Sequence, residues 1–185
     1  MLDFWFGTPG DPHFCERRAI WFKADAAFDA AVHAHCADLY RDAAAGRLDD
    51  WAGAPLSCLA LLLLLDQVPR NLFRRDCAAY ATDAKARAVA RAALAAGFDA
   101  RLHPVQRTFV YLPFEHSEDL DDQCLSVALF EAMPPEHLGP RTLTIVRRHH
   151  EIVARFGRFP HRNACLGRVT TPEEEAFLLE PDSSF

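Results

Sequence analysis

Apolar residues recur along most of the chain at the three- and four-residue spacing of amphipathic helices, and no segment alternates convincingly as a strand does. Seven helical segments are expected, joined by short turns rich in proline and glycine. The first six are expected over residues 24–45, 55–67, 76–96, 105–112, 117–133 and 140–156, and the last begins at Pro172. The pattern predicts an all-α single domain over residues 1–185, built from antiparallel helix pairs.

Proline and capping residues set the expected ends of these helices. Pro69 is expected to disrupt the end of the second segment and Pro113 to end the fourth, because proline lacks an N–H and clashes with the preceding turn. Ser117 is expected to cap the fifth segment. Thr171 and Glu174 match a capping box in the last one. The second segment is apolar all round, which predicts a place at the centre of the fold.

Length and composition are those of an ordinary globular protein. The chain has 185 residues, of which 50% are hydrophobic and 25% charged, so it can bury a core without a metal or disulfide staple. A net charge of -6 argues against a basic nucleic-acid-binding face. The apolar run 56–65 is shorter than the ~20 residues that span a bilayer, and no signal-peptide pattern opens the sequence. We expect a cytoplasmic protein with no nucleic-acid partner, no membrane partner and no cofactor.

The six cysteines suggest neither a disulfide framework nor a zinc site. They form no CxxC pair, and most lie among alanine and leucine, where a free thiol packs as a small apolar group. They are Cys15, Cys36, Cys58, Cys77, Cys124 and Cys165. All six are expected to be reduced and structural.

The loop 155–168 has the most unusual charge pattern in the chain, because it carries several guanidinium groups and no acid. Its basic residues are Arg155, Arg158, His161, Arg162 and Arg168. Guanidinium groups suit bidentate contacts with carboxylate or phosphate. One interpretation pairs these arginines with the protein's own acids in 115–122. The other leaves Arg158 and Arg162 to hold an anionic ligand, with His161 and Asn163 beside them.

Helical periodicity separates the adjacent histidines His149 and His150. At about 100° per residue, His149 falls in the middle of the apolar face of its helix and His150 at the edge. A buried imidazole needs a hydrogen-bond partner. His149 is therefore either a core histidine satisfied by a carbonyl or carboxylate, or, like His116, a candidate acid/base group in a pocket.

Asp66 ends the apolar helix, where a negative charge opposes the helix dipole. It is therefore expected to be buried and paired with a cation, either Arg70 four residues on or an arginine of the loop. One interpretation is a structural network that ties the central helix to that loop. The other places Asp66 and Arg70, with Glu118 and Gln123, around a polar ligand pocket.

No metal centre is expected. His116, Glu118, His149 and His161 supply suitable atoms, but their spacing matches neither HExxH nor the Glu-x-x-His pairs of di-iron bundles.

Five strings along the chain, FWFG, WFKADAAFD, LLLLLDQVPRNLFR, YLPFEHSEDLDDQ and RFGRFPHRNACLGRVTTPEE, together resemble the bacterial family called domain of unknown function 924. The resemblance runs from Phe4 to about Leu179. It implies an all-helical α-α superhelix related to tetratricopeptide-like folds, and it carries over no activity or active site. The chain departs from the family pattern at Val68, Glu115 and Val169, where an aromatic, an apolar and a polar residue are commoner.

Three interpretations of function remain. In the leading one, the DQ-PRN, HSED and GRFPHRN segments build a polar pocket for a small anionic molecule, and His149 or His116 acts as acid or base if a reaction follows. In the alternative, the chain is a helical scaffold that binds a protein or peptide in a groove, and the polar motifs are structural ties. In the third, the exposed part of the N-terminal aromatic segment forms a homodimer contact, whereas the alternative use of these rings is core packing. The segment comprises Phe4, Trp5, Phe6, Trp21 and Phe22.

Overall fold

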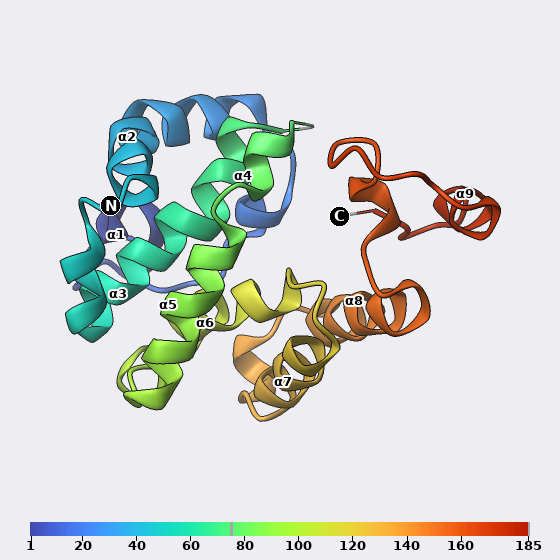
Figure 1. Cartoon of the computed structure of the whole chain (residues 1–185). Helices are drawn as coiled ribbons and strands as arrows, with labels where there is room; N and C mark the ends of the chain where they lie inside the picture. Colours follow the sequence, from blue (N-terminus) through green and yellow to red (C-terminus); the bar gives the residue numbers. More distant parts are fainter. Residues whose placement is uncertain (75, 185) are drawn as a thin grey trace.

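The fold is a set of α-helices connected by turns, loops and short 3-10 helices. The computed structural model describes residues 1–74 and 76–184, and no strand occurs among them. The α-helices are α1 (Leu2–Phe6), α2 (Ala26–Ala44), α3 (Pro55–Leu62), α4 (Val68–Leu72), α5 (Asp83–Ala95), α6 (Pro104–Glu115), α7 (Leu120–Glu131), α8 (Thr142–Phe156) and α9 (Pro172–Leu178) (Figure 1). The predicted all-α class is confirmed. The division into a single domain over 1–185 stays a prediction.

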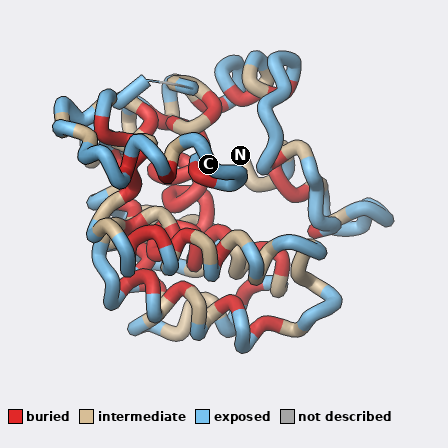
Figure 2. The backbone as a smooth tube through the Cα atoms, turned by 90° about the vertical axis from the view of Figure 1, so that its right-hand side faces the viewer, coloured by how far each residue is buried: buried red, intermediate tan, exposed pale blue. Residues whose placement is uncertain are grey.

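The apolar segment lies at the centre of the molecule, as its sequence predicts. Every residue from 58 to 69 is buried, and the buried stretches gather between outer helices whose turns alternate in exposure (Figure 2). The expected disruption before Pro69 is present, because the regular α-helix gives way before the proline, but the chain stays helical beyond it. A π-helical turn, η3 (Leu63–Gln67), ends α3, and α4 then begins at Val68. Pro69 therefore falls in the first turn of a new helix, where its missing N–H is not needed.

Two other expected helix ends also differ from the structure. Pro113 lies inside α6, which continues to Glu115, and the His116 N–H closes the last turn on the Leu112 carbonyl. Packing of a buried helix face therefore outweighs the local effect of the proline. The cap of α7 is Asp119 rather than Ser117, because the Asp119 carboxylate accepts the first free N–H groups of the helix.

Of two further predictions about the helices, one differs from the structure and one is confirmed. The predicted segment 76–96 is divided into the 3-10 helix η4 (Cys77–Tyr80) and α5. The capping box of Thr171 and Glu174 is confirmed at the start of α9.

Two hydrophobic clusters stabilise the fold. The larger one contains the N-terminal rings of Trp5, Phe6 and Trp21 packed on Phe109, so most of the aromatic segment lies in the core. Phe22 is the exception, at 46% exposure. The smaller cluster joins the end of α8 to α9. Within the described residues, the helices lack the combined length and apolar character needed to cross a membrane.

Candidate functional site: a cavity under the C-terminal loop

A cavity of about 510 Å³ lies between the helices and the C-terminal loop. Its walls come from α4 and η4, from α6 and α8, from the segment before α2, and from the 3-10 turn η7 (Pro160–Arg162). We call one group of lining side chains the polar end. It consists of Gln67, Arg70, Tyr80, Glu115, His116, His149, His161 and Arg162.

Asp66 lies directly behind the polar end. It is 1% exposed, and its Oδ1 is 2.8 Å from His116 Nδ1 while its Oδ2 accepts a hydrogen bond of 2.6 Å from Gln67. Arg70 Nη1 is 3.4 Å from Asp66 Oδ1. Burial alone would raise the pKa of Asp66, but Arg70 and His116 together hold that pKa below its ordinary value. The expectation that Asp66 is buried and paired with an arginine is confirmed.

Two guanidinium groups meet at the Asp83 carboxylate. Arg70 donates to both of its oxygens, at 3.0 and 3.1 Å, and Arg162 Nη1 is 3.6 Å from Oδ2. Arg162 also donates to the His116 carbonyl at 3.0 Å and lies 4.5 Å from the centre of the Tyr80 ring. Arg162 is 6% exposed, and its Nε has no hydrogen-bond partner among residues 1–74 and 76–184. It is a buried cation with a donor still available.

Glu115 and His149 form a second titratable pair where α6 meets α8. Glu115 Oε1 is 3.3 Å from His149 Nδ1, which is also 2.9 Å from the Ile145 carbonyl oxygen. Burial, with the Asp66 charge nearby, raises the pKa of Glu115 to about 8, and burial lowers the pKa of His149 well below its ordinary value. Both groups are therefore mainly uncharged at neutral pH. His149 is 3% exposed, which confirms its predicted place on the buried face.

Comparison with known proteins places the chain in a family. The sequence model of the family described as bacterial protein of unknown function (DUF924) matches residues 1–182. The chain belongs to this family. It is also similar to the solved structure of a protein of unknown function from Agrobacterium tumefaciens, at 43% identity and a TM-score of 0.83, over 97% of this chain and 94% of that one. No curated protein matches the chain.

Five of the residues singled out from the sequence of this DUF924 protein line the cavity, namely Arg70, His116, His149, His161 and Arg162. They come from the DQ-PRN motif, from the HSED motif, from α8 and from the loop after it. The structure therefore brings together the side chains of the three polar motifs, although they lie far apart in the sequence.

Arg158 does not line the cavity, so the expectation that it would face a ligand is wrong. It donates to both oxygens of Glu174, at 2.6 and 2.8 Å, and to the Val169 carbonyl. Asn163 is fully buried and donates to the same Glu174 carboxylate at 3.2 Å. These contacts hold the start of α9 against the loop, so Arg158 is paired inside the protein, but with Glu174 rather than with an acid of 115–122.

Glu118 and Gln123 also lie outside the cavity and have structural partners. Glu118 accepts hydrogen bonds from the Phe159 N–H and from both terminal nitrogens of Arg168, at 2.7 to 2.8 Å. Gln123 donates to the Glu115 carbonyl at 2.7 Å and to the Ser117 carbonyl at 2.6 Å. Both side chains fix the connection between α6 and α7, and through it the position of His116.

Cys77 and Cys165 form a disulfide, which contradicts the expectation that all six cysteines are reduced. Their Cα atoms are 5.3 Å apart, although 88 residues separate them in the chain. Cys77 begins η4 and Cys165 follows η7, so the bond joins two walls of the cavity. Cys15, Cys36 and Cys58 are free and buried, as expected, and Cys124 is free and exposed.

Several lining residues were not expected from the sequence. Tyr80 lies in an alanine-rich stretch without a polar motif, and Trp21 and Phe22 read as core aromatics. Glu115 differs from these residues in that the sequence did single it out, because it departs from the family pattern immediately before His116. Among the described residues, no group of three or more His, Cys, Asp or Glu side chains is placed to hold a metal ion.

Proposed function

We propose that this chain binds a small anionic molecule in the cavity, with the charged group of the ligand beside Arg162 and Arg70. The observation that carries the proposal is the convergence of two guanidinium groups with His116 and His161 at the polar end of one cavity. A guanidinium group presents parallel N–H donors that match the two oxygens of a carboxylate or a phosphate.

The charge balance around the polar end makes Arg162 the main anchor. Arg70 is already matched by Asp66 and by both oxygens of Asp83, whereas Arg162 makes only a longer contact with Asp83. Burial and Arg162 lower the pKa of His161 to about 4, so His161 adds no charge at neutral pH. A ligand anion would therefore compensate the guanidinium that is least compensated by the protein.

His116 is the acid/base group of this proposal. An ionised Asp66 can only accept, so Nδ1 of His116 donates to it and the lone pair is on Nε2. Burial and Arg70 lower the pKa of His116, which favours the neutral ring that carries its one proton on Nδ1. An imidazole held in this way suits a general base. His149 is less suited, because its Nδ1 is already close to a backbone carbonyl and to Glu115.

Thermal unfolding in matched salts tests the proposal. We expect sodium acetate and sodium phosphate to raise the melting temperature more than sodium chloride at the same ionic strength, because binding to the folded state stabilises it by mass action. Arg162→Lys keeps the positive charge but removes the planar set of N–H donors. The rise in melting temperature with acetate and phosphate should therefore be smaller in this variant. Arg168→Lys changes an arginine paired with Glu118 outside the cavity and should leave the response intact. Equal melting temperatures in all three salts would reject anion binding.

A further inference from the structure

The cavity has a second, apolar section beyond its polar end. Along α6, the lining residues recur every three or four positions, so a single face of this helix forms one wall. They are Val105, Thr108, Phe109, Leu112, Glu115 and His116. The rise of about 1.5 Å per residue makes this wall about 16 Å long. Charged and ionisable groups occupy only its C-terminal end, and the other positions are apolar except for Thr108.

The wall formed by α8 also changes from uncharged to ionisable side chains toward the polar end. On α8, His149 lies beside Glu115 at the polar end, whereas Ile145 and Thr142 lie one and two turns earlier. α7 packs between α6 and α8, and Phe130, near the C-terminal end of α7, also lines the cavity. The two walls therefore agree in placing an apolar section before the polar end.

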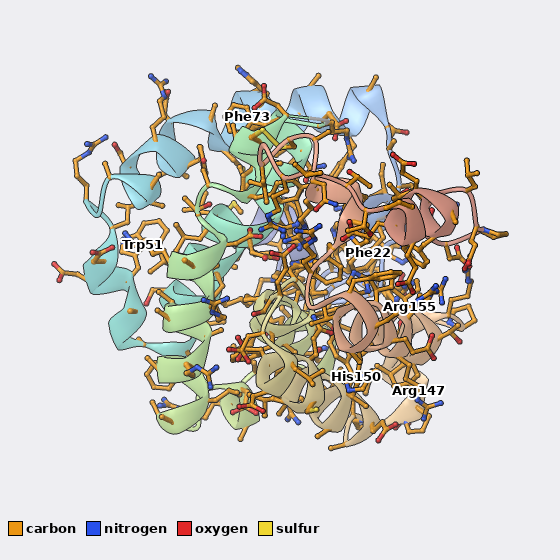
Figure 3. All side chains as sticks on the ribbon, turned by 45° about the vertical axis from the view of Figure 1, so that its right-hand side comes forward. Phe22, Trp51, Phe73, Arg147, His150 and Arg155 are labelled. Atoms are coloured by element: carbon orange, nitrogen blue, oxygen red, sulfur yellow. A yellow bond between two sulfur atoms is a disulfide. The ribbon has the colours of Figure 1, made fainter. Side chains whose placement is uncertain are left out.

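Aromatic rings form much of the rest of the apolar section, while Arg17, whose guanidinium carbon lies 5.3 Å from the centre of the Phe22 ring, and His137 also line the cavity. Trp21 packs edge-on against Phe109, with ring centres 5.1 Å apart, and Phe22 stacks on Phe109 at 6.2 Å. Phe22 is 46% exposed and lies in the half of the molecule that holds α8, far from Trp51 at the opposite edge (Figure 3). Arg17 and Phe22 are exposed lining residues, so the apolar section reaches the surface near Phe22. At the polar end, Glu115, His149 and Arg162 are buried.

We infer that the ligand is an amphipathic monocarboxylate, with its carboxylate at Arg162 and its hydrocarbon part along α6 between Phe109 and Ile145. This inference rests on the proposed function and specifies its ligand class. A single negative charge fits better than two, because the carboxylates of Asp66 and Asp83 already surround the guanidinium groups. The apolar section is lined mainly by rings and aliphatic side chains, and burying hydrocarbon against them is favourable. A cavity of about 510 Å³ has room for a chain or ring beyond the head group.

Calorimetry with acetate, butanoate, hexanoate and octanoate tests the inference. We expect one molecule to bind per chain, with affinity rising about fourfold for each added methylene, which corresponds to about 0.8 kcal/mol. Thr108→Phe places a ring in the apolar section. It should abolish the gain in affinity with each added methylene, while the binding of acetate should stay as in wild type. Ile145→Phe fills the same section from α8 and serves as the second variant if Thr108→Phe does not fold. Thr144→Phe makes a comparable change at an exposed position of α8 and should behave as wild type.

The outcomes separate the inference from the proposed function. If acetate binds but affinity does not grow with chain length, the amphipathic ligand is wrong and the anion site remains. If the increment persists unchanged in both Thr108→Phe and Ile145→Phe, the hydrocarbon part lies elsewhere and the inference is overturned. If neither acetate nor octanoate binds, the proposed function itself fails.

Discussion

The hydroxyl of Thr82 donates a hydrogen bond of 2.5 Å to the carbonyl of Leu65. In a regular helix this carbonyl would accept from the N–H four residues on, but that position is Pro69, which has none. Thr82 precedes α5, so a hydroxyl from another element donates to this carbonyl. The bond lies one residue before Asp66 and helps to hold the π-helical turn that supports the polar end. π-helical turns are frequent at functional sites.

Thr82→Val should destabilise the protein by about 1–3 kcal/mol, because it leaves a buried carbonyl without its donor. Pro69→Ala restores an N–H at the position that can serve Leu65, so the cost of Thr82→Val should be smaller in the Pro69→Ala background. Urea unfolding of the two single variants and the double variant measures this coupling. Thr8→Val, at an exposed site, is the control. Strict additivity of the two changes would show that Pro69 and Thr82 do not share this carbonyl.

Asp66→Ala should cost about 3–5 kcal/mol, because it removes a buried carboxylate and leaves the half-buried Arg70 and His116 without their shared partner. Asp38→Ala removes an acid that is 87% exposed and pairs with Arg41 one turn away, so it should change stability by less than about 0.5 kcal/mol. Thermal or urea unfolding compares the two variants. A melt of Asp66→Ala close to wild type would contradict the network described here.

Much of the fold follows from local patterns, and the departures have tertiary causes. The apolar run of the central helix predicts its burial, and the glycine after α8 adopts the left-handed conformation expected of a helix end, with φ 67°. The chain stays helical beyond Pro69 and Pro113 because a π-helical turn and a well-packed helix face compensate for the missing N–H groups. Such compensation depends on Thr82 and other distant residues, which no local pattern reports.

The candidate site was predictable in its polar part only. His116, Arg70 and Arg162 lie in motifs with unusual charge, whereas Tyr80 and Phe22 resemble ordinary core residues until the chain folds around the cavity. Arg158 illustrates the limit: the sequence pointed to acids near 118, yet its partner is Glu174, a capping residue close to it in the chain. The disulfide could not be predicted for the same reason, because the spacing of cysteines in the sequence does not show which distant segments come into contact.

Glu118→Ala should loosen the loop after α8, because Glu118 holds both the Phe159 N–H and the Arg168 guanidinium. We expect faster hydrogen exchange at the Phe159 amide and through the loop, with little change in α2 or α5. Glu173→Ala, which removes the 64% exposed partner of Arg155 from the neighbouring helix, is the matched control. Unchanged protection at Phe159 in Glu118→Ala would mean that other contacts position the loop.

Glu115→Gln should change the pH dependence of stability in a defined direction. The pKa of Glu115 is raised from 4.5 to about 8 in the folded protein, mainly by burial, so the folded state keeps a proton that the unfolded chain releases between those values. Stability therefore falls in this window as pH rises, by up to about 1.4 kcal/mol per pH unit for this group. Above about 8 both states are ionised and Glu115 adds no further slope.

Glutamine cannot ionise, so the unfolding free energy of Glu115→Gln relative to wild type should increase from about pH 4.5 to about pH 8 and then level off. The histidines of the polar end titrate in both proteins, and their contribution largely cancels in the difference. Glu131→Gln, at an acid 44% exposed, should show no such rise. Urea unfolding at half-unit steps of pH makes the comparison. A difference that stays constant across the window would mean that Glu115 is ionised in the folded protein, and the polar end would then carry one more negative charge.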